Sequence, residues 1–217
     1  MPGVPRELAE HCLRVDSKVK PVKEHLRRSA VQKRKAIGEE VARLLAVEFI
    51  REIYHSEWLA NVVMVPKKDT QVTKHDFRLC LDLRGVNNLT RVDSHPLPRI
   101  DDIITAIKGA AFITTIDIKS AFNAFLIHPD DRQKTSFYAG DYGKQQMKRL
   151  SMGLRNAPSQ FQRVMDQMMQ DFITPDTTQP DSEPSFLRVY LDDLIIFSNS
   201  WKSHCRHVRL VVQRLQQ

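Results

Sequence analysis

Two adjacent acids, Asp192 and Asp193, interrupt an apolar stretch of the chain, "SFLRVYLDDLIIFSNS" at residues 185–200. The apolar residues on both sides of them predict two buried strands. Carboxylates that lose water repel one another, and this costs free energy unless a partner neutralises them. A hairpin turn with solvated acids is one interpretation, because Asp tolerates turn dihedrals. By itself the pair is compatible with a simple turn or with a functional site.

A third acid, Asp117, also ends an apolar segment, "FITTID" at residues 112–117, and a short helical stretch follows it. We therefore expect its carboxylate at the edge of a sheet, where it can meet the other two. Three such carboxylates form an all-oxygen site suited to Mg²⁺ or Mn²⁺. Two such ions, about 3.5–4 Å apart, activate an attacking oxygen and stabilise a leaving one in phosphoryl transfer. Divalent cations between the acids would explain why their charges are tolerated.

The composition narrows the possible partners. At 217 residues the chain can form one large domain or two small ones with a buried core. Its net charge of +7 favours a polyanion, either nucleic acid or an anionic membrane surface. No apolar run approaches the roughly 20 residues of a spanning helix, and the first residues do not predict a signal peptide. Three distant cysteines predict no disulfide framework and therefore a reducing compartment; they are Cys12, Cys80 and Cys205.

The first half of the chain must supply elements that support these acids. Residues 1–28 carry three prolines and scattered basic residues, which predicts an extended arm. Residues 29–54 show apolar i, i+3, i+4, i+7 spacing and predict a helix. Residues 60–66 and 76–83 are apolar segments joined by a polar turn, which is typical of a hairpin. Prolines and then a short helix are expected in residues 95–107.

The second half mixes strands and helices without strict βαβ alternation, so the predicted class is α+β. Residues 134–150 predict a second hairpin with glycines at its turn. Residues 156–172 and 201–217 show helical patterns, and the proline-rich segment 173–184 between the first of them and the acids predicts a loop.

Several motifs resemble those of one enzyme family. The segments "FITTIDIKSAFNAF", "SMGLRNAPSQFQ" and "VYLDDLIIFS" resemble, in order and spacing, the palm motifs of reverse transcriptases, above all those of gypsy-type long-terminal-repeat retrotransposons. The segments "SEWLANVVMVPKKD", "FRLCLDLRGVNN" and "HPLPRIDDII" resemble the fingers region of these enzymes. "MPGVPRELAEHCLRVD" and "EEVARLLAVEFIREIYHSEWLANVV" look like plant elements of this group. The resemblance covers nearly the whole chain.

This resemblance implies the fingers and palm of a right-hand polymerase, with the palm built on an antiparallel sheet backed by helices and with no thumb. Within a single reverse transcriptase domain, residues 1–28 would form an N-terminal arm, 29–108 the fingers and 109–217 the palm, with a fingers hairpin near 128–150. The chain ends before the family's later palm lysine, primer grip, thumb, ribonuclease H and integrase. We therefore expect a truncated core that lacks the thumb and ribonuclease H segments of a parent polyprotein.

The resemblance also implies roles for individual residues. Asp117 and Asp192 would hold both metal ions, with Asp193 beside them and the main-chain carbonyl of Ile118 as an extra ligand. Phe122 falls on the position of a steric gate, whose ring would strike a ribose 2′-OH and so select deoxynucleotides. An aromatic residue in the core is the alternative for Phe122.

Further residues match positions that bind substrate. Lys67 and Arg78 match the fingers cations that hold the incoming triphosphate, and solvated hairpin cations are the alternative. Gly153 matches the element under the template base and nascent pair. Met152 stands where other reverse transcriptases have a substrate-contacting Gln. Tyr190, in the Tyr-x-Asp-Asp motif, is grouped with the substrate-binding residues.

Some features depart from the family pattern or have no chemical role in it. Ser151-Met152 replaces the usual Pro-Phe, Asn88 replaces a usual Lys, and the loop 173–186 looks longer than its counterpart. Gln162 is expected to support structure rather than contact substrate. His204 and His207 have no further zinc ligands at suitable spacing, so they are expected on a helix surface and not in the site.

The leading interpretation is an RNA-directed DNA polymerase core of a retrotransposon polyprotein. Its partners would be an RNA or DNA template with a primer, and deoxynucleoside triphosphates. It would act inside the cell, in a cytoplasmic particle or the nucleus, without membrane attachment or secretion. The alternative is a decayed or repurposed polymerase core that binds nucleic acid or protein without catalysis. An RNA-synthesising polymerase shares the acids but fits Phe122 badly.

Overall fold

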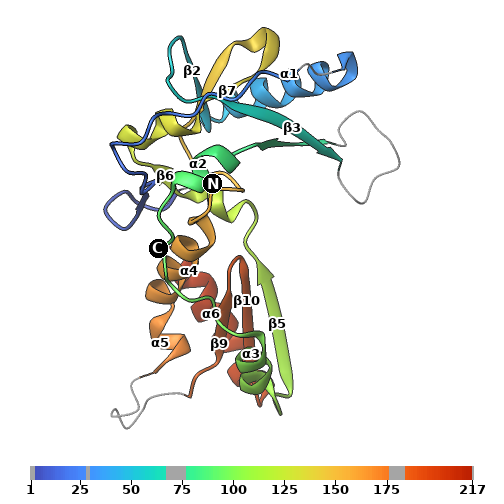
Figure 1. The fold of residues 1–217 in the computed structure, drawn as a ribbon. Coiled ribbons are helices and arrows are strands. Elements are labelled where there is room, and N and C mark those ends of the chain that lie inside the picture. Colours follow the sequence, from blue (N-terminus) through green and yellow to red (C-terminus); the bar gives the residue numbers. More distant parts are fainter. Residues whose placement is uncertain (1–2, 28–29, 67–76, 176–183, 217) are drawn as a thin grey trace. The chain divides into compact units, whose positions relative to one another are not determined.

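The computed structural model describes residues 3–27, 30–66, 77–175 and 184–216. Its helices and strands are mixed, as the α+β prediction expects (Figure 1). The chain forms two compact units, each made of two segments that are distant in sequence: Met1–Val92 with Phe122–Ala157, and Asp93–Ala121 with Pro158–Gln217. The division between fingers and palm after residue 108 concerns the subdomains of a polymerase and stays a prediction.

The first unit is built on a five-stranded sheet with the strand order β2-β8-β7-β3-β4. Only β3 and β7 pair in parallel. Both predicted hairpins are confirmed, since β3 pairs with β4 and β7 with β8 in antiparallel register. The strands are β2 (Ile50–Ile53), β3 (Ala60–Pro66), β4 (Phe77–Leu81), β7 (Phe137–Tyr138) and β8 (Lys144–Met147).

Shorter elements complete this unit. Strand β1 (Glu10–His11) pairs in parallel with β6 (Leu126–Ile127). Besides a first helix, described next, the unit contains the helix α2 (Arg84–Leu89) and the 3₁₀-helices η2 (Pro129–Thr135) and η3 (Gly140–Tyr142), and it includes all but the first residue of a further 3₁₀-helix, η1 (Ala121–Ala124). The turn between β7 and β8 needs glycine at residue 143, where φ is 68°.

Helix α1 (Val31–Ala46) is shorter than predicted, because the helix expected over 29–54 ends eight residues early. Glu48 takes a left-handed conformation with φ of 56°, and the Phe49 N–H donates to the Leu44 carbonyl at 2.9 Å. This bond and the left-handed residue form a Schellman-type helix end, usually made by glycine. The β-branched residues that follow then form β2 instead of another helical turn.

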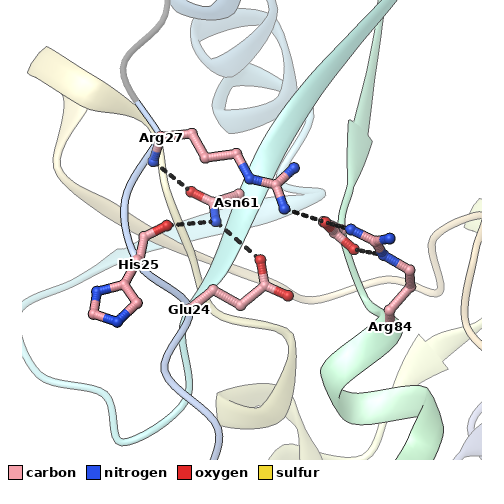
Figure 2. A network of polar contacts seen from close by, with 6 residues as sticks. Glu24, His25, Arg27, Asn61 and Arg84 are labelled. Atoms are coloured by element: carbon pink, nitrogen blue, oxygen red, sulfur yellow. Dashed lines mark hydrogen bonds and ion pairs between the residues drawn. The ribbon is translucent and has the colours of Figure 1, made fainter.

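The N-terminal arm is held against β3 by one buried amide, that of Asn61 (Figure 2). Its Nδ2 donates to the Glu24 Oε2 and to the His25 carbonyl, both at 2.9 Å. Its Oδ1 accepts from the Arg27 N–H at 3.1 Å. The Glu24 N–H also donates to the Leu59 carbonyl at 2.8 Å, so this part of the arm follows the strand as an added edge segment.

Asp82 joins the arm to α2, because its Oδ2 accepts from Arg84 at 2.6 Å and from Arg27 at 3.2 Å (Figure 2). Its side chain is only 5% exposed. The hydrogen bond from Arg84, together with the charges of Arg84 and Arg27, holds the pKa of Asp82 below its usual value. A carboxyl whose pKa is lowered by folding stabilises the fold above its unfolded-state pKa, and this stabilisation disappears as the pH falls through the folded-state pKa.

We therefore expect Asp82→Asn to lower the free energy of unfolding at pH 7 by about 1.5–3 kcal/mol, the usual range for hydrogen bonds to a charged group. The difference from wild type should shrink to near zero in acid, once the wild-type carboxyl is also protonated. Urea unfolding of both chains over this pH range measures it. Asp101→Asn, at an exposed position, is the control. A loss that is equal at every pH would contradict the expectation.

The second unit contains a three-stranded antiparallel sheet with the order β5-β10-β9, whose strands lie side by side in Figure 1. The strands are β5 (Phe112–Asp117), β9 (Leu187–Tyr190) and β10 (Asp193–Ser198). The helices are α3 (Ile100–Ile107), α4 (Ala157–Met168), α5 (Gln170–Ile173) and α6 (Trp201–Leu215). The predicted strand over 112–117 is confirmed, whereas the helix predicted over 156–172 is interrupted between α4 and α5.

One face of this sheet is covered and the other is open. Helix α6 packs on β10 and β5, where its His204 reaches Thr114. Side chains alternate between the two faces of a strand, so Ile113, Thr115 and Asp117 lie on the face opposite α6, and all three are exposed. The palm prediction of an antiparallel sheet backed by helices is therefore confirmed. None of the helices in the described part of the chain combines the length and apolar character that a membrane span requires.

Candidate active site

The main-chain segments that carry the three predicted catalytic acids meet at one end of the β5-β10-β9 sheet. Asp193 is the register partner of Asp117 on β5 and of Tyr190 on β9. Asp192 occupies the turn before β10, and its carbonyl accepts from the Ile118 N–H at 2.9 Å. The main chain therefore fixes both acid-bearing segments against each other, independently of their side chains.

The charges at this end of the sheet are unfavourable without a counterion. Asp117 and Asp193 are exposed on the open face, and Asp192 is half-buried. Like charges directly opposite on antiparallel strands destabilise the pair. The donors are carboxylate oxygens, the ligands that Mg²⁺ prefers, so the chemistry of the set fits a divalent cation. Within residues 3–27, 30–66, 77–175 and 184–216, no three His, Cys, Asp or Glu side chains are gathered closely enough to hold a metal ion.

Both acid-bearing segments contain a strained residue. Leu191, directly before Asp192, has φ of 53°, and Ser120, three residues after Asp117, has φ of 57°. A side chain other than glycine rarely adopts this left-handed region, and such strain concentrates at functional sites. Strain persists only where surrounding contacts enforce it, so the turn at Leu191 requires a specific support.

That support comes from Gln162 of α4, which is fully buried. Its Oε1 accepts from the Leu191 N–H at 2.8 Å. Its Nε2 donates to the Val189 carbonyl at 3.1 Å and to the Asp166 Oδ1 at 2.8 Å. Gln162 thus binds the main chain of the hairpin formed by β9 and β10, called the catalytic hairpin below, on both sides of Tyr190. This agrees with the structural role expected of Gln162.

The histidines of α6 are a correction to the sequence analysis, which placed them on a helix surface. His204 and His207 are only 4% and 7% exposed. Their Nδ1 atoms lie 3.0 and 2.8 Å from the Ser198 Oγ, and the His204 Nε2 lies 2.8 Å from the Thr114 Oγ1. They continue the helical spacing of the buried Val211 towards the N-terminus, and this periodicity could have placed them inside.

The single hydroxyl of Ser198 lies within hydrogen-bond distance of two imidazole nitrogens, and it can donate its one proton to only one of them. We expect Ser198→Ala to lower the free energy of unfolding by about 1–3 kcal/mol, because two buried ring nitrogens lose their partner. Urea unfolding measures the effect, with Ser94→Ala at an exposed position of the same unit as control. Equal stability of the two variants would show that Ser198 does not organise the histidines.

Gly153 and Met152 lie in a tight turn of the first unit. Gly153 has φ of 96°, a conformation that favours glycine, and its carbonyl accepts from the Asn87 Nδ2 at 2.7 Å. The Asn87 Oδ1 in turn accepts from the Arg155 N–H at 2.9 Å. The Met152 residue is 63% exposed. The sequence analysis did not single out Asn87, whose role depends on a partner 66 residues away.

The remaining predicted site residues also belong to the first unit. Arg78 is exposed on β4. Phe122 is half-buried in η1, and its carbonyl accepts from the Phe125 N–H at 3.1 Å. Lys67 lies outside the described residues. The structure thus brings the acids, Ile118 and Tyr190 together in the second unit, and it carries Arg78, Phe122, Met152 and Gly153 in the first.

A family model described as "Reverse transcriptase (RNA-dependent DNA polymerase)" matches residues 65–217, more than half of the chain. This chain belongs to the reverse transcriptase family. The match contains all three acids of the Asp117, Asp192 and Asp193 set. It begins upstream of β4, so it extends across both compact units.

This chain matches only a part of each of its longer relatives. It is 35% identical over 180 residues to the retrovirus-related Pol polyprotein from transposon gypsy of Drosophila melanogaster, covering 82% of this chain and 16% of that protein. It is 30% identical over 185 residues to the corresponding polyprotein from transposon opus of the same species, covering 85% and 17%. It is 28% identical over 200 residues to the enzymatic polyprotein of Cauliflower mosaic virus (strain NY8153), covering 92% and 27%. The predicted likeness to gypsy-type elements is confirmed, and the chain spans less than a third of each of these relatives.

Solved structures support the fold of this chain. The native prototype foamy virus protease-reverse transcriptase matches with a TM-score of 0.78 at 22% identity, covering 96% of this chain and 25% of that one. The foamy viral protease-reverse transcriptase in complex with dsDNA also matches with a TM-score of 0.78, at 20% identity, covering 96% and 40%. The predicted α+β polymerase fold is therefore confirmed.

Proposed function

We propose that this chain is the catalytic core of an RNA-directed DNA polymerase that extends a primer with deoxynucleotides. The observation that carries the proposal is the register at the end of the open sheet face. Asp193 lies opposite Asp117, and the main chain of Asp192 is bonded to Ile118. Membership of the reverse transcriptase family supports assigning this arrangement to nucleotide transfer.

In the proposed reaction, the oxygen of the primer 3′-OH attacks the α-phosphorus of a deoxynucleoside triphosphate, and the hydroxyl proton is released to solvent. The bond to the β-phosphate breaks, and pyrophosphate leaves. Asp117, Asp192, Asp193 and the Ile118 carbonyl would hold Mg²⁺ or Mn²⁺. Such ions, when bound, stabilise the charge that develops on the attacking and leaving oxygens. The bonded main chains of β5 and the catalytic hairpin hold the acid-bearing segments in place for this task.

The other predicted residues would bind substrate. Lys67 and Arg78 would hold the triphosphate, and Phe122 would exclude a ribose 2′-OH. Met152 and Gly153 would support the template base and nascent pair.

Tyr190 would contact the substrate from the strand that leads to the acids. A primer–template duplex suits the net charge of +7 and the open, solvent-facing sheet. Foamy viral protease-reverse transcriptases of the same fold were solved with dsDNA and with an RNA/DNA hybrid, which supports nucleic acid as the partner of this chain.

The direct test measures incorporation of labelled deoxynucleotide opposite an RNA template by the full-length gene product that contains this chain. Template-directed extension that requires Mg²⁺ or Mn²⁺ is the expected result. Duplex binding that weakens with salt but is never accompanied by extension would indicate instead a polymerase core that only binds nucleic acid.

A further inference from the structure

The bonds of Gln162 continue to a second segment of the same unit. The Asp166 carboxylate, one helical turn beyond Gln162 on α4, accepts from the Gln162 Nε2 at its Oδ1. Its Oδ2 lies 3.1 Å from the Nε2 of His95, in the segment before α3. His95 is in turn fixed by its main-chain N–H, which donates to the Asp93 Oδ1 at 3.1 Å, and Asp93 is paired with Arg163. Three positions of one helix face therefore bind the catalytic hairpin and the segment that carries His95.

The chemistry of these groups determines which one donates and which one accepts in each hydrogen bond. An ionised carboxylate only accepts hydrogen bonds, so Asp166 requires an N–H from each of its two partners. The amide nitrogen of Gln162 must then face Asp166, and this leaves its oxygen for the Leu191 N–H. By the same requirement, the Nε2 of His95 carries a proton. The Asp166 carboxylate thus requires the same orientation of the Gln162 amide that the Leu191 N–H and the Val189 carbonyl require.

We propose that Gln162, Asp166 and His95 are positioning residues of the polymerase site, which set the left-handed turn at Leu191 and with it the main chain of Asp192 and Asp193. The effect on catalysis rests on the proposed function, whereas the effect on the turn does not. We call these three hydrogen-bonded residues, Gln162, Asp166 and His95, the relay. The relay acts through the Leu191 N–H, because no other main-chain donor of the turn is bonded to Gln162 in the described structure. The sheet register fixes Asp193 from β10 onward, so Leu191 and Asp192 are the positions that the relay controls.

Packing alone would not produce this dependence. Gln162 is fully buried, and an apolar side chain of similar size would fill the same volume. Such a side chain leaves the Leu191 N–H and the Val189 carbonyl without their partner and removes the bond that opposes the strain at Leu191. If the relay exists, replacing Gln162 should weaken the protection of the Leu191 amide from hydrogen exchange more than it lowers the free energy of unfolding of the whole chain.

The first experiment measures hydrogen exchange of the Leu191 amide by NMR in the 217-residue chain. In Gln162→Leu this amide should exchange at least about tenfold faster, because its acceptor is gone. Gln167→Leu is the matched control, since it makes the same change at an exposed position of the same helix. His95→Leu should accelerate the exchange less, and His95→Gln, whose amide can still donate to Asp166, should restore it towards wild type.

The second experiment exchanges the donor and the acceptor of the hydrogen bond between residues 162 and 166. Gln162→Glu places a carboxylate against the Asp166 carboxylate and should lower kcat about tenfold or more, with the KM for deoxynucleotide changed less than about threefold. Adding Asp166→Asn supplies an amide donor to the new carboxylate, and kcat should rise at least about threefold above that of Gln162→Glu. Recovery stays partial, because the Val189 carbonyl remains without its donor. The Asp166→Asn change alone should have a small effect, because an Asn amide can turn to accept from Gln162.

The outcomes separate this inference from the proposed function. If the wild-type protein transfers no nucleotide, the proposed function fails, and Leu191 exchange still decides whether the relay exists. If the wild type is active but Gln162→Leu matches Gln167→Leu in both exchange and kcat, the relay is overturned. If Gln162→Leu does not fold, the second experiment decides, because a double variant no better than Gln162→Glu also overturns it.

Discussion

Asp192→Asn is expected to reduce template-directed incorporation of deoxynucleotide by at least about a hundredfold, because the site loses a charged oxygen ligand for its divalent ions. The fold should be retained. The bond that fixes this turn to β5 uses the Asp192 carbonyl and not its side chain. The substitution also removes one of three neighbouring negative charges, so the free energy of unfolding without metal should stay the same or rise.

This expectation is measured by primer extension and by urea unfolding with and without Mg²⁺. Ligand that binds only the folded state raises its stability, so Mg²⁺ should stabilise the wild type and not Asp192→Asn. Asp130→Asn, at an exposed position of η2, is the control and should change neither quantity. Residual incorporation within about tenfold of wild type would remove Asp192 from the proposed set of metal ligands.

The parts of the fold that were predicted well depend on short-range patterns. Strand β5 was bounded correctly because apolar residues end abruptly at Asp117. The two hairpins were found because polar or glycine-containing turns separate apolar segments. The acids were singled out for the same reason, since charges inside an apolar stretch stand out in any sequence.

The parts that were missed depend on long-range partners or on unusual local conformations. The end of α1 was placed too late because Glu48 takes the left-handed position where glycine is the usual signal. His204 and His207 were placed outside because their partners, the buried Ser198 and the half-buried Thr114, lie on strands. A polar side chain can be buried at low cost only when such partners exist, and one sequence does not reveal them.

The site shows the same division. The register of Asp193 with Asp117 follows from two strands that each end on an acid, and it could be anticipated. The bonds from Gln162 to Leu191 and from His95 to Asp166 connect residues 29 and 71 positions apart. Only the folded unit brings these residues together, so the groups that orient a site are harder to infer than those that perform its chemistry.

The surroundings of Phe122 favour a role outside the core. Its neighbours in and after η1, Ala121 and Phe125, are buried, whereas Phe122 is only half-buried. The core positions of this short helix are therefore already occupied by other residues. The partial exposure of Phe122 is compatible with contact to a substrate, which supports the proposed gate over the alternative of a core aromatic.

Phe122→Val is consequently expected to reduce the preference for deoxynucleotides over ribonucleotides, expressed as a ratio of kcat/KM values, on the order of a hundredfold. The smaller side chain would remove the collision with the 2′-OH, so the change should come mainly from faster use of ribonucleotides. Phe122→Tyr keeps the ring and should retain the preference. Single-nucleotide extension with matched deoxy- and ribonucleotides measures both ratios. If Phe122→Val uses deoxynucleotides as well as wild type and its preference is unchanged, the ring does not contact the sugar, and selection must reside in other residues.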